Sequence, residues 1–327
     1  MEQQTGLPYA DAQKIAAGNK NRTFTNTRND GRSGSERIRS ANFPEIAIEP
    51  KFKLPKGGRY FAIGSCFARN VEVALVGMGV DVITSKCLIP GEFYELAGPA
   101  RNGVLNAYTP QSMLQLVNWS EREDRADVGL LQLSDDEWSD MLVSGTKFLS
   151  IDQITRIRNE VLNTYDLLPI ADVVILTLGF TEAWFDNKDQ IFVNRSPGGS
   201  VRTVKKGDRY SFHNATPMEA VEAVEATIKS IFRLTKGNAK IIITTSPVPI
   251  HATFTGRDVV SANLYSKSAL LSAAVWAAAN YEFVDYYPSY ELIMYSDPVE
   301  TWMPDGVHIY PDRVKQVISR FAQAYFE

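Results

Sequence analysis

Short apolar runs alternate with longer stretches of helical periodicity from residue 58 onward, and this alternation is what most constrains the fold. The runs "RYFAIG", "ADVVILTLG" and "AKIIITTSPVP" read as buried strands. Segments such as "CFARNVEVALVGMG" and "TPMEAVEAVEATIKSIFRLTKGN" carry apolar residues at helical spacing. Strands alternating with crossover helices predict an α/β fold with a doubly wound, mainly parallel sheet of about five strands.

The chain of 327 residues is long enough for one large α/β domain with insertions. Residues 1–50 hold few large apolar side chains, so we expect an extended or flexible N-terminal arm there. Residues 51–327 are expected to form the folded domain, with loop insertions at about 87–150 and 186–214. A short helix is expected at "PQSMLQLVNWS" in the first insertion. In the second, "QIFVN" and "RYSFHN" are expected to pair as a hairpin.

Charge and cysteine content exclude several classes of protein. The formal net charge is -4, so net electrostatics imply no nucleic-acid partner. The two cysteines, Cys66 and Cys87, lie in no metal-spaced cluster, so no bound metal is expected. We see no secretory signal pattern and no run of about 18 apolar residues. We therefore expect a cytoplasmic protein without a membrane span. The sequence does not indicate an oligomeric state.

Ser65 follows the strand "RYFAIG" directly and precedes a helical segment. Ligands of such sheets bind at the carboxyl ends of the strands, where a helix N-terminus offers N–H groups to an oxyanion or a phosphate. Gly64 would allow a sharp turn and close approach of a substrate. Serine is also a preferred helix N-cap, so the position alone fits a cap or a nucleophile. The turn has neither GxGxxG nor GxxxxGK[ST], which argues against a nucleotide site.

A serine nucleophile needs a base and a group that orients the base. Of the three histidines, His308 lies three residues after Asp305 in "WMPDGVHIYPD", ahead of the last helical segment. From one turn both side chains can reach the crevice, and the carboxylate would hold the imidazole in the tautomer that accepts the serine proton. We therefore expect Ser65, His308 and Asp305 to meet at the carboxyl edge of the sheet.

The chain resembles a known family over most of its length. "GSCFA" at 64–68 is the signature of the GSCFA domain family, a branch of the SGNH/GDSL-like hydrolase superfamily. Further blocks that resemble the family are "LTLGFTEAWFD", "FHNAT", "TTSPVPIHATF", "NLYSKSALL", "YYPSYELI" and "PDGVHIYPD". Together they run from about residue 58 to 326 and leave only the N-terminal arm outside.

The resemblance implies a three-layer α/β/α fold with flavodoxin-like strand order, and a catalytic domain over residues 51–327. It implies that Ser65 is the nucleophile, His308 the base and Asp305 its orienting acid, with no metal or organic cofactor. SGNH enzymes also use a glycine and an asparagine as oxyanion donors. Here the block reads Gly179-Phe180-Thr181-Glu182, with Thr181 where the superfamily has asparagine. Asn106 is the candidate replacement, and the backbone N–H of Ser65 is the other donor.

Four more residues are candidates for contact with the substrate. Glu182 and Trp184 follow a strand end, and we expect Glu182 to orient the substrate. His213 could make either a structural hydrogen bond or a substrate contact. His251 lies on the same edge of the sheet without a carboxylate nearby in sequence, which favours a structural or supporting role.

Three other features of the sequence could contribute a nucleophile or a binding surface. Cys66 is intrinsically the better nucleophile, but one residue into a helix it should point away from Ser65, as a packed thiol. Ser266 and Lys267 could form a dyad, yet neighbouring residues on a helix do not face each other. The basic residues of "NRSPGGSVRTVKKGDRY" fit a solvated loop, or a rim that attracts an anionic substrate.

These residues lead to two hypotheses about function. The first is a serine esterase or O-acyltransferase that acts on a small acyl ester, such as an acetyl ester of a carbohydrate, through an acyl-Ser65 intermediate. The second is a catalytically inactive module with the same fold that binds glycans or supports an assembly. In both, the partner is a small molecule or a glycan, and no nucleic acid is expected.

Overall fold

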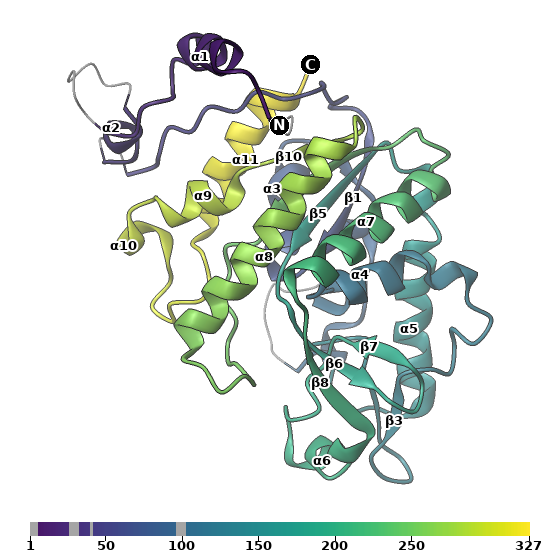
Figure 1. Cartoon of the computed structure of the whole chain (residues 1–327). Coiled ribbons are helices and arrows are strands. Elements are labelled where there is room, and N and C mark those ends of the chain that lie inside the picture. The colour runs from purple at the N-terminus through teal and green to yellow at the C-terminus, as the bar shows by residue number, and fades with distance from the viewer. Residues whose placement is uncertain (1–5, 26–32, 40–41, 96–102) are drawn as a thin grey trace.

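The computed structural model describes residues 6–25, 33–39, 42–95 and 103–327. Its centre is a sheet of five parallel strands in the order β10-β9-β5-β1-β2 (Figure 1). The strands are β1 (Arg59–Gly64), β2 (Asp81–Val82), β5 (Val173–Leu178), β9 (Lys240–Thr245) and β10 (Val284–Tyr286). The expected five-stranded sheet with flavodoxin-like order is confirmed.

Helices cover both faces of this sheet, because successive strand residues point to opposite faces. Phe61, Ile63 and Leu176 pack into one cluster, whereas Tyr60 and Ile175 pack into the other. The first face is covered by α4 (Pro110–Val117), α5 (Ile151–Tyr165), α7 (Pro217–Leu234) and α8 (Val259–Asn280). The second is covered by α3 (Cys66–Gly77), α9 (Ser289–Met294) and α11 (Pro311–Tyr325). The result is a three-layer α/β/α fold.

Both insertions contain structure of their own. The first includes the expected helix, α4, and the antiparallel pair β3 (Leu130–Gln132) and β4 (Trp138–Asp140). Residues 96–102 of this insertion lie outside the described residues. The second insertion contains β7 (Ile191–Val193), the short helix α6 (Val201–Val204) and β8 (Tyr210–Asn214), and it follows β6 (Glu182–Asp186), which ends where the insertion begins. Strands β6, β7 and β8 and helix α6 lie at the end of the molecule opposite the C-terminus (Figure 1).

The expected hairpin in the second insertion was wrong. β7 and β8 do not pair with each other; each pairs antiparallel with β6, which lies between them. The sequence "EAWFD" of β6 places Trp184 against Phe212 of β8, with ring centroids 5.5 Å apart. Cross-strand aromatic contacts of this kind stabilise the β6–β8 pairing, and they join segments more than twenty residues apart.

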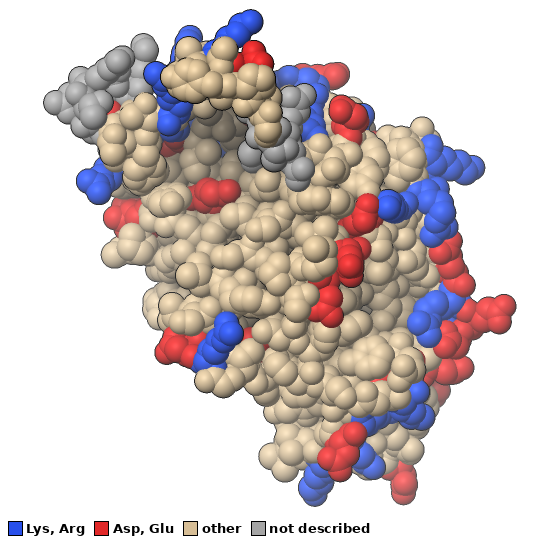
Figure 2. Space-filling model, viewed as in Figure 1, with Lys and Arg blue, Asp and Glu red and all other residues tan. Residues whose placement is uncertain are grey.

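The arginines of this insertion are paired within the protein. Arg195 pairs with Glu95 and Arg202 with Glu137, and Arg209 Nη2 lies 2.6 Å from Asp186 Oδ2. On the face shown in Figure 2, positive and negative side chains alternate around the rim and the centre is mostly uncharged. These contacts favour the interpretation of a solvated loop over a rim that attracts anions.

The N-terminal arm contains α1 (Tyr9–Gly18) and α2 (Gly34–Arg39), and α1 buries none of its side chains. Residues 1–5, 26–32 and 40–41 of the arm lie outside the described residues. The expectation of an extended or flexible arm therefore stays a prediction for these residues. The chain then reaches the final helix, where the N–H of Leu54 donates to the carbonyl of Tyr325 at 2.8 Å. Asn42 Nδ2 also donates to the carboxylate of Glu300 in α10 (Pro298–Thr301) at 2.9 Å. Within the described part of the chain, no helix is both long and apolar enough to cross a membrane.

Lys51 ties the segment after the arm to the end of α8. Its Nζ donates to the carbonyls of Ala278, Tyr281 and Val284. Because the carbonyls of Ala278 and Tyr281 lie at the negative end of α8, Lys51→Met is expected to lower the free energy of unfolding by about 1 kcal/mol. Urea denaturation measures this, with Lys56→Met at an exposed turn as control. Equal stability of the two variants would contradict the role of Lys51.

Candidate active site

Ser65 occupies the junction between β1 and α3 with its side chain uncommitted. It is the N-cap of α3, yet its side chain makes no capping hydrogen bond. The residue is 1% exposed, and its Oγ has no hydrogen-bond partner among the residues that the structure describes. The neighbouring Cys66 thiol interacts with this hydroxyl, though not with the geometry of a hydrogen bond. The helix therefore does not use the Ser65 hydroxyl, and the explanation of Ser65 as a structural cap loses its basis.

Cys66 is partly buried and packs against the cluster that contains Phe67 and Val71. Burial raises the pKa of its thiol, and the Ser65 hydroxyl opposes this with a smaller effect. A thiol with a raised pKa holds little thiolate at neutral pH, so it is a poor nucleophile. These observations favour the packed thiol over a reactive cysteine.

Gly64 and Gly179 are required by close approaches of the backbone. Gly64 has φ +154°, and a Cβ there would lie 2.6 Å from the carbonyl oxygen of Thr177 on β5. A Cβ at Gly179 would lie 2.6 Å from the carbonyl oxygen of Tyr108. Both glycines thus let neighbouring chain segments pack tightly beside Ser65.

Asn106, the proposed oxyanion donor, lies beside the end of β1. It forms an isolated parallel bridge with Gly64, and the N–H of Ala107 donates to the Gly64 carbonyl at 2.9 Å. Its Nδ2 donates to the Tyr108 hydroxyl at 3.1 Å, while its buried Oδ1 has no partner. Since an amide nitrogen carries two N–H groups, one donor is left for another acceptor.

Asp305 and His308 form a pair on a turn between α10 and α11. Asp305 Oδ2 lies 2.6 Å from His308 Nδ1, and Asp305 Oδ1 accepts the backbone N–H groups of Val307 and His308 at 2.9 Å each. The turn is closed by a bridge between Trp302 and Ile309. This arrangement makes Nδ1 the N–H donor to the carboxylate and leaves Nε2 as the basic nitrogen.

Ser65 and His308 lie at the same end of the sheet. α3 starts at the carboxyl end of β1 and packs against α11. The C-terminus of α11 lies near the start of β1, where the rings of Phe326 and Tyr60 are 6.3 Å apart. The start of α11, next to His308, must therefore lie toward the carboxyl edge. No hydrogen bond joins Ser65 Oγ to His308 in the structure, and the side chain of His308 is 56% exposed.

The Asp305 carboxyl should show in the pH dependence of stability. The His308 ring first, and then the backbone N–H groups of His308 and Val307, hold its pKa well below the usual range. The folded chain thus favours the carboxylate, so this stabilisation is present above the ordinary pKa of about 4 and is lost as pH falls below it. Asp305→Asn should be less stable than wild type at pH 7, and the difference should shrink progressively as pH falls from about 5 toward the lowered pKa of Asp305.

Urea denaturation at several pH values measures this difference. Asp135→Asn, at an exposed position, serves as the control. A difference between Asp305→Asn and wild type that stays constant with pH would contradict the assigned interaction.

The other predicted contact residues make bonds within the protein. The Thr181 N–H donates to Ser266 Oγ at 2.9 Å, and its hydroxyl donates to Asn214 at 2.7 Å. The Glu182 carboxylate accepts the Thr253 hydroxyl at 2.6 Å and the Phe254 N–H at 2.8 Å. Both residues therefore hold loops in place at this edge, and we give neither a direct role toward substrate.

Three aromatic or imidazole side chains lie around the same loops. Trp184 packs edge-on against Phe254, with ring centroids 4.9 Å apart. His213 Nε2 lies 3.5 Å from Glu219 Oε1, which fits the structural alternative. His251 is exposed on the loop that follows β9.

Sequence reasoning missed several polar groups at this edge. Thr177, Thr245 and Ser246 are buried at or just after the ends of β5 and β9, and their hydroxyls have no partner. Buried hydroxyls usually have partners, so such a row marks a place where water or a ligand completes the hydrogen bonding. Lys267, which the sequence suggested could reach a substrate anion or an acidic partner, is instead buried in the same region.

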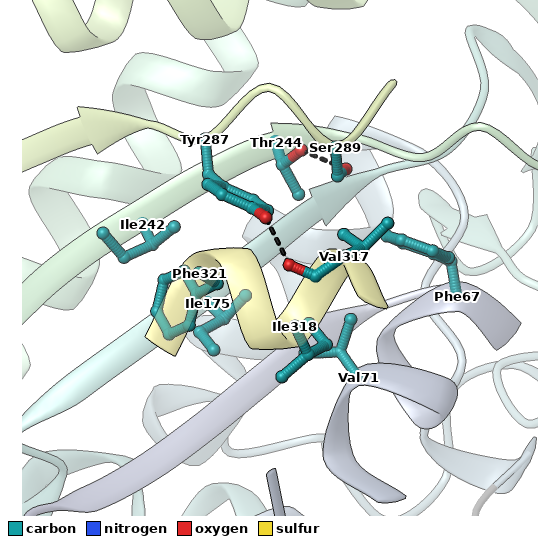
Figure 3. A pocket seen from close by; sticks show the side chains of 10 residues that line it. All are labelled: Phe67, Val71, Ile175, Ile242, Thr244, Tyr287, Ser289, Val317, Ile318 and Phe321. Atoms are coloured by element: carbon teal, nitrogen blue, oxygen red, sulfur yellow. Dashed lines mark hydrogen bonds between the residues drawn. The ribbon is translucent and has the colours of Figure 1, made fainter. Parts of the chain in front are cut away.

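A small cavity lies on the second face of the sheet, between the strands and helices α3 and α11 (Figure 3). Its lining is mostly apolar and includes Phe67, Val71 and Phe321. The hydroxyls of Thr244 and Ser289 on its wall bond to each other at 2.5 Å. Since Ser65 does not line it, we regard it as a packing gap. Among the described residues, no three His, Cys, Asp or Glu side chains gather as a metal site would require.

The fold and this edge define a doubly wound α/β protein with a free serine hydroxyl at its first strand–helix junction. The model of the GSCFA family matches residues 59–321, and the chain belongs to that family. Comparison with the curated proteins finds no match. One crystal structure aligns with 83% of this chain and 99% of its own at 13% identity and a TM-score of 0.33, a similarity too low to support an argument.

Proposed function

We propose that the protein is a serine esterase or O-acyltransferase of the SGNH type, acting on small acyl esters such as acetyl esters of carbohydrates. The observation that carries the proposal is the Asp305–His308 pair, with 2.6 Å between Oδ2 and Nδ1, at the end of the sheet where the Ser65 hydroxyl has no partner. An oriented imidazole and an uncommitted serine are the two parts that nucleophilic acyl transfer needs.

In the proposed reaction, Ser65 Oγ attacks the ester carbonyl while His308 Nε2 takes its proton. The tetrahedral intermediate collapses, its C–O bond to the alcohol breaks, and His308 returns the proton to the leaving alcohol. Water or a sugar hydroxyl then attacks the acyl-Ser65 ester while His308 takes its proton. The bond between the acyl carbon and Ser65 Oγ breaks, His308 returns the proton to Ser65 Oγ, and the acid or the acylated sugar leaves. Asn106 Nδ2 is the proposed side-chain donor to the oxyanion, a contribution worth about 3 kcal/mol in comparable sites.

The reaction requires Ser65 and His308 to come closer than they are in the structure. Catalytic hydrogen bonds are often long without substrate and tighten when it binds. Rotation of the Ser65 hydroxyl and a shift of the exposed turn at 302–309 would supply this approach.

The test is covalent labelling with a fluorophosphonate followed by peptide mass spectrometry. We expect one adduct per chain, on Ser65, together with turnover of a chromogenic acetyl ester. The denatured protein is the control for nonspecific labelling. A folded protein that gains no adduct on Ser65 and does not cleave the ester would refute the proposal and favour the inactive binding module.

A further inference from the structure

Lys267 is a buried lysine without a carboxylate partner. It lies in the middle of α8 and is 1% exposed. Its Nζ donates to the carbonyl of Gly179 at 2.8 Å and to that of Val248 at 2.6 Å. The Phe180 ring lies 5.0 Å from Nζ. Within the described residues, no carboxylate shifts the pKa of Lys267. Among these residues, the one titratable group that does so is the thiol of Cys66, through its charge.

Burying a charged amine costs free energy of desolvation, and apolar contacts do not offset this cost. Desolvation disfavours its charged form and lowers the pKa of Lys267 to about 7. The rest of the buried face of α8 is mostly alanine and leucine, including Leu270 and Ala274. An apolar side chain of similar length would fill the same volume, so the two hydrogen bonds are what distinguishes a lysine here.

Those hydrogen bonds join the loops that follow two adjacent strands. Gly179 comes directly after β5, and Val248 comes three residues after β9. β5 is also the neighbour of β1, so the Gly179 loop runs beside Ser65. Ser266, next to Lys267 on α8, accepts the N–H of Thr181 at 2.9 Å. Asn263 of α8 also accepts the N–H of Ile250 at 3.2 Å, so α8 holds the loop after β5 at two points and the loop after β9 at two.

We propose that Lys267 is a positioning residue for the reaction at Ser65, and that it fixes the backbone of residues 179–181 against residues 246–248. This inference rests on the proposed function. Lys267 does not touch the substrate; it keeps the walls beside the serine in one arrangement. Loss of that arrangement lowers the rate of the chemical step more than it weakens binding, because reaction depends more steeply than binding on placement.

The test compares Lys267→Met with Lys229→Met. The control residue Lys229 lies on the solvent-facing side of α7, and its side chain is 61% exposed. Hydrogen exchange should become faster at 179–181 and 246–248 in Lys267→Met and stay unchanged in β1 and α3. The kcat for a chromogenic acetyl ester should fall about 100-fold with little change in KM, and fluorophosphonate labelling should slow in parallel. Lys229→Met should match wild type in all three. If Lys267→Met does not fold, Lys267→Gln takes its place: its shorter side chain keeps N–H donors but cannot reach both carbonyls, so exchange and kcat should change in the same direction by less.

The outcomes separate this inference from the proposed function. If wild type reacts with both reagents, and the variant keeps wild-type kcat or wild-type exchange in both loops, the positioning role is overturned while the proposed function stands. If wild type is inert toward both reagents, the proposed function fails and the positioning role fails with it.

Discussion

Ser65→Ala is expected to reduce kcat for an acetyl ester by roughly 10⁶-fold, leaving only the small residual rate that substrate binding and the oxyanion donors supply. The proposed mechanism has no second nucleophile, because burial raises the pKa of the Cys66 thiol. The same substitution should leave stability almost unchanged. Ser65 Oγ makes no hydrogen bond and does not cap α3, so alanine removes no native contact of that kind.

The combination of lost turnover and retained stability is the diagnostic result. Ester hydrolysis, fluorophosphonate labelling and thermal unfolding are measured on the same preparation. Ser139→Ala, a fully buried serine in β4, provides the matched control and should keep activity. If Ser65→Ala turned over the ester at the wild-type rate, the nucleophile would have to be sought elsewhere.

Gly64→Ala is expected to destabilise the fold by about 3–5 kcal/mol, enough to unfold a marginal domain. Its φ of +154° is unfavourable for any residue with a Cβ, and the new methyl group would meet both Oγ1 and the carbonyl oxygen of Thr177. β1 cannot move aside, because it is held between β5 and β2 in the sheet.

Urea denaturation of three variants tests this explanation. Gly77→Ala, where a Cβ would meet nothing within 4 Å, should be close to wild type. Adding Thr177→Ala to Gly64→Ala removes the contact with Oγ1 but leaves the backbone contact, so it should restore only part of the stability. Full recovery in the double variant would show that the backbone approach is unimportant.

The main helices and strands could be predicted because their signals are local. The amphipathic pattern and the Thr216-Pro217 start define α7, which begins at Pro217 with Thr216 as a capping box. The apolar run of β5 reads as a buried strand in the sequence and is buried along its whole length. Alternation of such elements was enough to predict the parallel sheet, whereas its strand order was expected from the family resemblance.

Pairings between distant segments could not be read in this way. β6 separates β7 from β8 because its aromatic residues pack across to both, a contact that no sequence window contains. Glu182 follows a strand end in the sequence, as a substrate-binding residue would, but Thr253 and Phe254 occupy its carboxylate.

The burial of Lys267 could have been predicted from its position in the helical pattern, although a lysine is hydrophilic. It lies at helical spacing from Leu270 and Ala274, on the face of α8 that turns toward the core. A lysine on an otherwise apolar face is a candidate for a buried, hydrogen-bonded amine. The carbonyls that it bonds to come from two loops, and only the folded chain brings these together.

The pairing of Leu54 with Phe326 has a practical consequence for handling the protein. It places the final residues near the start of β1, at the end of the sheet opposite Ser65. Immobilising the protein on a sensor surface through its C-terminus should therefore leave the opposite edge facing solution, open to bulky polysaccharides as well as to small esters.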